Sequence, residues 1–150
     1  MFHFSVSFVL RRVEDDTQYL IQSEVDGQMV TLDKDTGRLM MRTRNETSPW
    51  QRWLVARVPG TASVQFISVE TGETLSLRGM SDFTLGEDTE AGLSGGYVTI
   101  TATGGLVYTR NIMKPVAWTD PIRGPDVEGT LNAYHCCHRT QKFKFIPFET

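Results

Sequence analysis

The sequence predicts an all-β fold, either a closed barrel or a sandwich, and three observations lead to that prediction. Apolar residues alternate with a period of two, as in Phe2, Phe4, Val6 and Phe8, which is the pattern of a strand with one buried face. The 13 glycines and 6 prolines lie largely between such runs, where turns are required. Segments of about 45 residues resemble one another along the chain, which indicates a fold built from repeated units.

Length and charge restrict the classes of partner. At 150 residues the chain fits a single domain, 1–150, and a domain of this size buries roughly 70% of the surface that its unfolded chain exposes. The formal net charge is -3 and charged residues make up 22% of the chain, so there is no broad basic face for a phosphate backbone. We therefore expect no nucleic-acid partner.

The N-terminal run and the two cysteines bear on where the protein resides. In MFHFSVSFVLRR the charges follow the apolar residues, so we interpret the run as a first strand and not as a signal peptide. No apolar stretch approaches the roughly 18 residues of a membrane-spanning helix, so we expect no membrane partner. Cys136 and Cys137 are adjacent, and neighbouring cysteines rarely satisfy disulfide geometry. The sequence thus favours a cytoplasmic protein, or one released without a recognisable signal peptide.

The first repeated element is a pair of hairpins, at residues 18–32 and 63–77. The stretch QYLIQSEVDGQMVTL can be written above SVQFISVETGETLSL without a gap. The matched pairs are Ile21 with Phe66, Ser23 with Ser68, Gly27 with Gly72 and Leu32 with Leu77. Each stretch has the pattern of a strand, a turn that contains glycine, and a second strand, which predicts a β-hairpin in both places.

The second repeated element is an aromatic residue at the start of a strand. Trp53 lies 45 residues after Phe8, Tyr97 lies 44 residues after Trp53, and Phe143 lies 46 residues after Tyr97. We expect Trp53, Tyr97 and Phe143 to be core residues, each contributing about 1.5 to 3 kcal/mol or more through burial. The spacing gives repeats at approximately 1–50, 51–95 and 96–150, and the third is the most divergent because it contains an irregular stretch rich in Pro and Gly.

Two short motifs add a family resemblance. Gln51-Arg52-Trp53 closes one unit as Q-x-W, and Gln141-Lys142-Phe143 closes the last as Q-x-F. Together with the 45-residue register, they resemble the β-trefoil proteins and, within them, the ricin-B-like lectins, over nearly the whole chain. The resemblance implies twelve short strands in three four-stranded units, arranged as a six-stranded barrel capped by three hairpins. It also implies that each Gln fastens its strand to neighbouring backbone by hydrogen bonds.

Asp26 is the sugar-binding candidate that the resemblance implies for the first unit. Lectins of this type hold sugar hydroxyls with a carboxylate early in the unit, and counting back 25 residues from Gln51 reaches Asp26. Aspartate in an Asp-Gly pair is also a common turn residue, so the turn interpretation stays open beside the binding one. The position before Gln51, an Asn in these lectins, is Trp50.

The irregular part of the third unit supplies a second group of candidates. Long irregular loops on a rigid scaffold often carry binding residues, and this one mixes aromatic and polar side chains suited to the apolar face and the hydroxyls of a sugar. The candidates are Trp118, Asp120, Asn132, Tyr134 and His135, with Arg123 and Asp126 in the same loop. The alternative is that Trp118 packs in the core and that the acidic residues only solvate the loop.

Enzyme and metal signatures fail in this sequence. It contains no G-x-S-x-G, H-E-x-x-H, P-loop or G-x-G-x-x-G motif. The run His135-Cys136-Cys137-His138 would place its side chains on opposite faces of a strand, so the four cannot converge on one zinc unless a helical turn or bulge intervenes. We therefore expect no catalytic residues, no cofactor and no metal.

Three binding functions remain. The leading hypothesis is a lectin-like module that binds glycans or glycoproteins without catalysis. Each sugar hydroxyl contributes only about 1 kcal/mol, so a homodimer or several sites would supply avidity. The alternative is a β-trefoil protease inhibitor with an exposed loop at 39–49, 81–96 or 112–129. A further alternative is an actin- or protein-binding trefoil.

Overall fold

The computed structural model describes residues 17–87, 97–109, 112–121, 129–136 and 138–148. They form the eleven strands β1 (Gln18–Ser23), β2 (Met29–Leu32), β3 (Leu39–Arg42), β4 (Trp53–Arg57), β5 (Val64–Ser68), β6 (Phe83–Glu87), β7 (Val98–Thr109), β8 (Ile112–Thr119), β9 (Gly129–Thr130), β10 (Asn132–His135) and β11 (Phe143–Phe148), and the short 3-10 helices η1 (Pro49–Gln51) and η2 (Arg139–Gln141). No described residue belongs to a helix long and apolar enough to cross a membrane. The strand predicted around Phe8 and the loop residues Arg123 and Asp126 lie outside the described residues.

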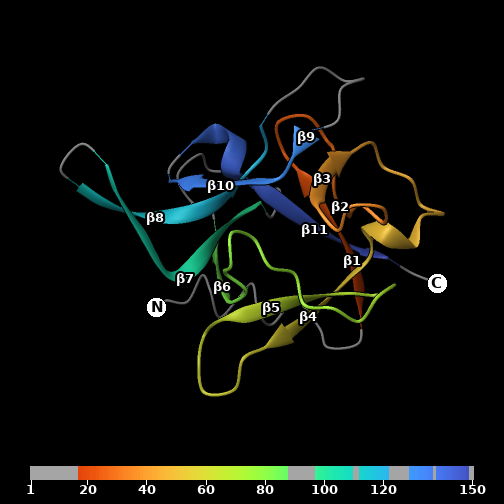
Figure 1. Cartoon of the computed structure of the whole chain (residues 1–150), viewed down its shortest axis with the longest axis horizontal. Coiled ribbons are helices and arrows are strands. Elements are labelled where there is room, and N and C mark those ends of the chain that lie inside the picture. The colour runs from red at the N-terminus through yellow and green to blue at the C-terminus, as the bar shows by residue number, and fades with distance from the viewer. Residues whose placement is uncertain (1–16, 88–96, 110–111, 122–128, 137, 149–150) are drawn as a thin grey trace.

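Six of the strands pair in a closed ring (Figure 1). β1 pairs with β4, β4 with β5, β5 with β6, β6 with β7, β7 with β11, and β11 pairs again with β1, always antiparallel. The first and last strands of the three units are therefore β1 and β4, β5 and β6, and β7 and β11. This ring is the predicted six-stranded barrel.

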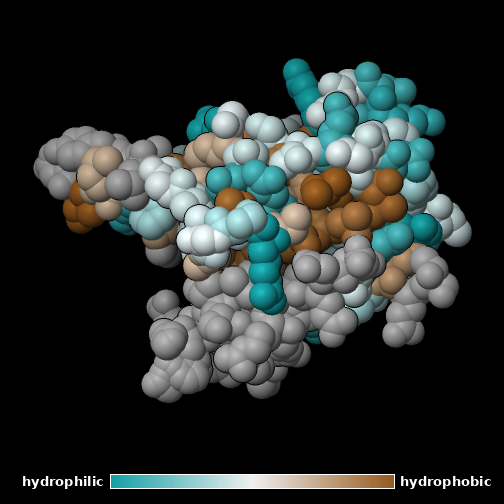
Figure 2. Space-filling model, turned by 90° about the horizontal axis from the view of Figure 1, so that it is seen from below, coloured by the Kyte–Doolittle hydropathy of each residue, from teal (hydrophilic) through white to brown (hydrophobic). Residues whose placement is uncertain are grey.

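The remaining strands form hairpins outside the ring. β2 pairs with β3, β8 pairs with β10, and β9 adjoins β3. β7 and β8 also continue past the ring as a two-stranded arm, in which residues 106–109 pair with 112–115. The arm projects from the left of the molecule in Figures 1 and 2. Near its end Ile112 and Met113 are 56% and 52% exposed, so apolar side chains there meet solvent.

The predicted equivalence of the two hairpin turns is confirmed. Ser23 and Ser68 are both buried, and the backbone N–H of each closes its turn with a hydrogen bond of 2.9 Å. Gly27 and Gly72 have φ values of 75° and 74°, a conformation that glycine adopts without a steric penalty. The 45-residue register is therefore correct for the first half of the first two units.

The register fails after this turn, and the prediction for Tyr97 is wrong. β6 joins β5 to β7 as β4 joins β1 to β5, so its first residue, Phe83, is the counterpart of Trp53 and Phe143. Phe83 lies 30 residues after Trp53 and 60 before Phe143, and the expected spacing of 45 is only their average. Tyr97 precedes β7 and is half-buried, whereas its neighbour Val98 is in the core.

The middle unit is short because a tight turn replaces its outer hairpin. The backbone N–H groups of Leu77 and Met80 donate to each other's carbonyl oxygens at 2.9 and 3.0 Å. Only two residues, 81 and 82, then separate Met80 from β6, whereas the first unit places β3 and η1 between β2 and β4. The middle unit therefore offers much less surface than the other two.

Aromatic rings fill the centre of the barrel. The ring of Trp118, from β8, lies 4.9 Å from Phe66, 5.2 Å from Phe83 and 6.0 Å from Phe143, measured between centroids. Trp53 is also buried, and its indole N–H donates to the backbone oxygen of a β2 residue at 3.0 Å. The predicted core positions of Trp53 and Phe143 are confirmed.

Candidate functional site

Gln51 is buried in the first unit, and its side chain holds the surrounding backbone together by hydrogen bonds. Its side-chain oxygen accepts from the backbone N–H of Asn45 at 2.8 Å, and its NH₂ donates to the backbone oxygen of Thr43 at 2.9 Å. The same NH₂ donates to the hydroxyl of Thr31 at 3.2 Å. The amide thus ties the loop after β3 to β2 and to the start of β4, which is the role that the resemblance implied.

Gln141 does the same in the third unit. Its oxygen accepts from the backbone N–H of His138 at 2.8 Å, and its NH₂ donates to the backbone oxygen of His135 and to the hydroxyl of Thr119, both at 2.9 Å. The partners match those of Gln51 in kind, namely a backbone N–H, a backbone oxygen and a threonine hydroxyl, and the NH₂ of Gln141 has one further backbone oxygen, that of Tyr134, at 3.4 Å. Both glutamines therefore have a structural role.

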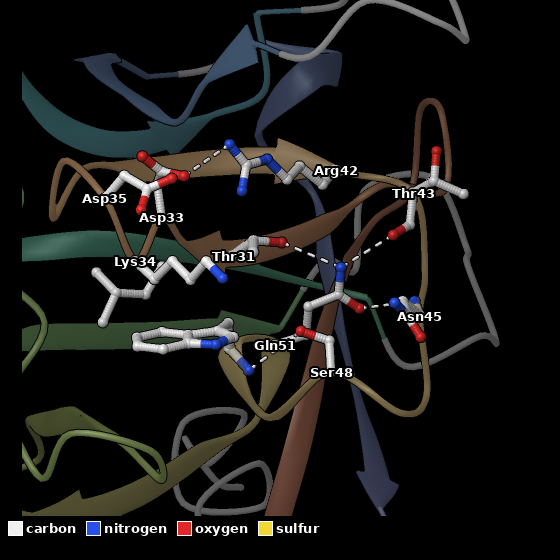
Figure 3. A pocket seen from close by; sticks show the side chains of 11 residues that line it. Thr31, Asp33, Lys34, Asp35, Arg42, Thr43, Asn45, Ser48 and Gln51 are labelled. Carbon is white, nitrogen blue, oxygen red and sulfur yellow. Dashed lines mark hydrogen bonds and ion pairs between the residues drawn. The ribbon is translucent and has the colours of Figure 1, made fainter.

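A hollow of about 470 Å³ opens beside Gln51 (Figure 3). Ligand pockets in proteins measure roughly 300 to 1,000 Å³, so its size suits a small molecule or part of a larger one. It is lined by residues of β2, by the loops that follow β2 and β3, and by η1. Its charged, amide and aromatic lining side chains, apart from Gln51, are those of Asp33, Lys34, Asp35, Arg42, Asn45 and Trp50. Sequence reasoning did not select any of these six as site residues.

An ion pair orders one wall of the hollow. Arg42, the last residue of β3, donates to the Asp33 carboxylate at 3.0 Å, and Figure 3 shows the two side chains meeting there. Thr36 donates to the other carboxylate oxygen through its hydroxyl and its backbone N–H. Hydrogen bonds from Thr36, followed by that from Arg42, hold the pKa of Asp33 below its usual value of 3.8. Asp33 is therefore ionised at neutral pH and positions the guanidinium.

Trp50 supplies an aromatic wall. It lies in η1, which begins with Pro49, and the Ser48 hydroxyl caps this helix by accepting from the Trp50 backbone N–H at 3.2 Å. The Trp50 side chain is half-buried and lines the hollow. The signal in the sequence was the presence of Trp where the lectins that the chain resembles have Asn, directly before Gln51.

Asp26 and Asp120 come together elsewhere, and neither lines the hollow. Asp26 lies in the exposed turn after β1, and its carboxylate accepts from the Gln28 backbone N–H at 3.1 Å. Asp120 follows β8, is 1% exposed, and donates its backbone N–H to Thr140 at 3.0 Å. Desolvation and a hydrogen bond from one carboxyl to the other raise the pKa of Asp26 to about 6. Asp26 is therefore protonated in mildly acidic solution, and its carboxyl can then donate to Asp120.

The remaining candidates of the third unit divide between core and surface. Trp118 is 1% exposed, so the alternative that placed it in the core is confirmed and its ring is closed to a surface ligand. Asn132 and Tyr134 are exposed on β10, and His135 is half-buried at its end. The rings of Tyr134, His135 and His138 form the unit-three ring cluster, with centroid separations of 4.1 Å (Tyr134–His135), 5.7 Å (Tyr134–His138) and 5.0 Å (His135–His138).

Cys136 is in a disulfide bond, which corrects the expectation from the sequence. Cys137, the other cysteine of the sequence, lies outside the described residues. Cys136 lies at a bend directly after β10. Disulfide formation depends on the directions of the two Cβ atoms, and a bend permits what an extended strand does not. Among the described residues, no group of three or more His, Cys, Asp and Glu side chains is arranged to hold a metal ion.

Comparison with known proteins identifies the fold. No family model and no curated protein sequence matches the chain. The Macrolepiota procera ricin B-like lectin (MPL) in complex with lactose matches with a TM-score of 0.68 and 12% identity, over 89% of this chain and 96% of the lectin. SeviL bound to asialo-GM1 saccharide matches with a TM-score of 0.63 and 13% identity, over 87% and 96%. The designed threefold symmetric protein ThreeFoil matches with a TM-score of 0.67 and 11% identity, over 86% and 97%. The fold is a β-trefoil.

The units of this β-trefoil differ in what they present at the surface. The first carries the hollow beside Gln51, the middle one lacks the outer hairpin, and the third carries the unit-three ring cluster and the projecting arm. Identities of 11 to 13% establish a shared fold, and one fold hosts many functions. Function must therefore be argued from the residues of these sites.

Proposed function

We propose that this β-trefoil is a carbohydrate-binding protein without catalytic activity, and that the hollow beside Gln51 is its main site. The observation that carries the proposal is the combination, in one hollow, of carboxylates, cationic groups, an amide and a half-buried indole. A sugar presents hydroxyls at its edge and C–H groups on its face, so polar groups and an aromatic ring together suit it. The lactose complex of the ricin B-like lectin and the saccharide complex of SeviL add support from proteins with this fold.

The charged residues have distinct roles in this proposal. Asp35 is exposed and accepts hydrogen bonds from sugar hydroxyls, while Lys34 and Arg42 donate to hydroxyl oxygens. Asp33 orients Arg42, because both of its carboxylate oxygens already accept hydrogen bonds within the protein. Hydrogen bonds to charged groups contribute about 1.5 to 3 kcal/mol each, more than neutral ones. These residues therefore provide most of the affinity at this site.

Trp50 covers the apolar face of the sugar. Its half-buried indole is held by the capped turn of η1, so little conformational freedom is lost when a ring stacks on it. Asn45 lines the same hollow and carries both a donor and an acceptor. Its side-chain oxygen already accepts from Thr47, which leaves its NH₂ for the ligand.

The geometry of the acidic pair supports a binding function over glycoside hydrolysis. Glycosidases use two carboxyl groups separated by about 5 to 9.5 Å, with the scissile bond between them. Asp26 and Asp120 hydrogen-bond to each other, which leaves no room for a sugar between them, and Asp120 is 1% exposed. We assign the pair to structure, and the ligand to the hollow.

The number of binding sites determines the apparent affinity for a multivalent ligand. Single lectin sites are weak because sugar hydroxyls exchange water for protein partners at a net gain of about 1 kcal/mol. The exposed ring of Tyr134 in the unit-three ring cluster provides a second stacking surface on another unit. Two sites on one rigid scaffold, or a homodimer, would raise the apparent affinity for a multivalent glycan or glycoprotein.

A glycan array with multivalent display tests this proposal. The parent protein is compared with Trp50→Ala and Asp35→Asn, which alter the hollow, and with Glu70→Gln, a matched loss of charge at an exposed position outside it. We expect selective glycan binding by the parent and by Glu70→Gln, and a loss of about tenfold or more in the two hollow variants. Binding that survives Trp50→Ala and Asp35→Asn unchanged would move the site elsewhere, and the absence of any glycan binding would remove the lectin function.

A second candidate function, protease inhibition, is favoured by the projecting arm. An inhibitor must present a segment that stands clear of its scaffold, and the β7–β8 arm does so with Ile112 and Met113 exposed. Of the candidate loops 39–49, 81–96 and 112–129, residues 39–42, 83–87 and 112–119 are instead strand, in β3, β6 and β8, and residues 88–96 and 122–128 lie outside the described residues. Serine and cysteine proteases should be assayed beside the glycan array. Inhibition that is abolished by Ile112→Asp with Met113→Asp, together with a silent array, would replace the first proposal with this one.

A further inference from the structure

The tight turn of the middle unit contains an arginine in a strained conformation. The turn runs from Leu77 to Met80, and its two central residues, Arg78 and Gly79, have φ values of 55° and 77°. A two-residue turn with positive φ at both positions favours Asn, Asp or Gly at the first, because longer side chains meet a steric penalty there. Arg78 is the only residue other than glycine with a positive φ in the described part of the chain. An arginine at such a position indicates a requirement for its side chain.

The Arg78 side chain reaches the third unit. Its Nη1 donates to the backbone oxygen of Ala133 at 3.2 Å, so the guanidinium lies at the edge of β10. Arg78 is exposed, and this hydrogen bond uses one of the five N–H groups of the guanidinium. An asparagine would suit the turn better, but its side chain is too short to reach β10. Arg78 therefore joins two units and keeps several donors for a ligand.

Asn132 and Tyr134 lie on either side of this contact. They are two positions apart in β10, so their side chains point to the same face, and both are exposed, whereas Ala133 between them is buried. The Tyr134 ring is 52% exposed and is supported by the two imidazoles of the unit-three ring cluster, at centroid distances of 4.1 and 5.7 Å. An amide, an aromatic ring and a guanidinium are thus presented together along one short strand.

This surface carries positive charge, although the chain has a net charge of -3. Residues 129–136 and 138–141 contain no Asp or Glu, but they contain two histidines and the exposed Arg139. Asp120, which follows the neighbouring strand β8, is 1% exposed. Within the described residues no carboxylate forms an ion pair with Arg78 or Arg139. The surface therefore favours a ligand that supplies a negative charge.

We propose that Arg78, Asn132 and Tyr134 form a second glycan site, and that this site selects sugars bearing an anionic group, either a carboxylate or a sulfate. The inference rests on the proposed function for its class of ligand, but it uses none of the residues that line the hollow beside Gln51. The planar fork of Arg78 pairs with the anion, Asn132 binds a ring hydroxyl, and the sugar ring stacks on Tyr134. The middle unit thus takes part in recognition through one side chain.

Matched monosaccharides test the proposal on the full chain. Methyl glucuronide and methyl glucoside share one ring and differ by a carboxylate in place of a hydroxymethyl group, and the sulfate ester of the glucoside supplies the other anion. Titrations at low ionic strength are followed by NMR at the backbone amides of Asn132 and Tyr134. We expect an anionic sugar to bind at least about fivefold more tightly than the glucoside, and the stronger of the two identifies the anion. Equal affinity for all three sugars would overturn the proposal, as would acetate binding as tightly as the glucuronide.

Variants of Arg78 separate the charge from the turn. Arg78→Asn removes the cation and suits the turn, so we expect chemical denaturation to show a stable protein that has lost the preference for anionic sugars. Arg78→Lys keeps the charge without the fork and should retain part of the preference. Arg38→Gln, a matched loss of charge at an exposed position in the first unit, is the control. A preference that survives Arg78→Asn, or that is lost in Arg38→Gln, would show that Arg78 does not select the ligand.

The backbone amide of Asn45, in the hollow, distinguishes this inference from the proposed function. A response to sugars at Asn45 with none at Asn132 and Tyr134 would leave the hollow as the site and overturn the inference. A response at Asn132 and Tyr134 with none at Asn45 would support the inference and remove the hollow as the main site. No response at either place, together with a silent glycan array, would overturn both.

Discussion

The carboxyl group of Asp26 hydrogen-bonds to that of Asp120, although the two residues are 94 positions apart in the sequence and belong to the first and third units. The neighbouring backbone reinforces the junction, because Glu24 donates its N–H to Lys142 at 2.9 Å and Asp120 donates to Thr140 at 3.0 Å. Below about pH 6 the proton on the Asp26 carboxyl favours this hydrogen bond, because the pKa of Asp26 is raised to about 6. The first and third units are thus joined by a contact whose strength depends on pH.

Asp26→Asn should make the free energy of unfolding less dependent on pH. The pKa of Asp26 is about 6 in the folded protein against a usual 3.8, so the folded state binds more protons between these values. The parent is therefore stabilised at lower pH and loses that contribution as the pH rises from about 4 to above 6. An amide donates to Asp120 at any pH. We expect the parent to lose about 1 kcal/mol relative to the variant between pH 4.5 and 7.5, since exposure of Asp26 to solvent reduces the effect.

Urea unfolding at the two pH values measures this difference. Glu70→Gln, an exposed carboxyl outside the pair, is the control and should follow the parent. If Asp26→Asn and the parent showed the same pH dependence, the two carboxyls would not share a proton.

Thr36→Val and Arg42→Ala should distinguish a change in the pKa of Asp33 from a change in glycan binding by the hollow. Both changes remove hydrogen bonds that lower the pKa of Asp33, so each should raise that pKa, and Thr36 has the larger effect. Only Arg42 lines the hollow, so we expect Arg42→Ala to weaken glycan binding about tenfold and Thr36→Val to leave it nearly unchanged. Carbon NMR of the Asp33 carboxyl and glycan titration provide the two readouts. A similar loss of glycan affinity in both variants would mean that Asp33 itself contacts the ligand.

Trp53→Ala and Trp50→Ala should have opposite consequences. Trp53 is buried in the core, and its removal should lower the free energy of unfolding by about 3 to 5 kcal/mol. Trp50 is half-buried at the wall of the hollow, so its removal should cost less stability and should abolish stacking on the sugar. Chemical denaturation and glycan binding, measured on both variants, give the comparison. A folded Trp53→Ala protein with parental stability would contradict the core assignment.

Gln141→Ala should loosen the third unit without unfolding it. The change leaves the His138 N–H and the His135 carbonyl without their present partner, at a cost of about 1 to 3 kcal/mol. Hydrogen exchange at the His138 amide should accelerate, while the amide of Asn45, which bonds to Gln51 in the first unit, should keep its protection. An equal acceleration of hydrogen exchange at both amides would indicate that the change destabilises the whole protein, and not only the third unit.

The resemblance to the β-trefoil proteins implied the six-stranded barrel. The sequence patterns themselves were sufficient for an all-β fold and for the first hairpin of each of the first two units. Those predictions rested on local sequence patterns. A strand with one buried face shows apolar residues at every second position, and a tight turn shows a glycine between two such strands. The middle unit was misassigned because one unit spans 30 residues and the next 60, and their average imitates a regular repeat. Tyr97 was taken for a core residue on that average, where the pairing of the strands assigns Phe83.

The candidate site was harder to predict because it depends on contacts between distant residues. A count of 25 residues back from Gln51 reached Asp26, but the chain brings Gln51 to Thr31 and Asp26 to Asp120. The hollow is built by the loop after β2 and by η1, whose charged and aromatic residues have the composition of ordinary surface loops. The only sequence signal there was Trp50, at the position where the lectins that the chain resembles have Asn.

The tight turn between Leu77 and Met80 limits the architecture of any complex that this protein builds. A β-trefoil with a binding site on each of its three units would be trivalent, and with branched glycoconjugates it would form cross-linked networks. Here the middle unit lacks the outer hairpin, so under the proposed function only the first and third units would bind glycan. A protein with two such sites would join its ligands end to end into linear chains, and it would form branch points only when two copies associate.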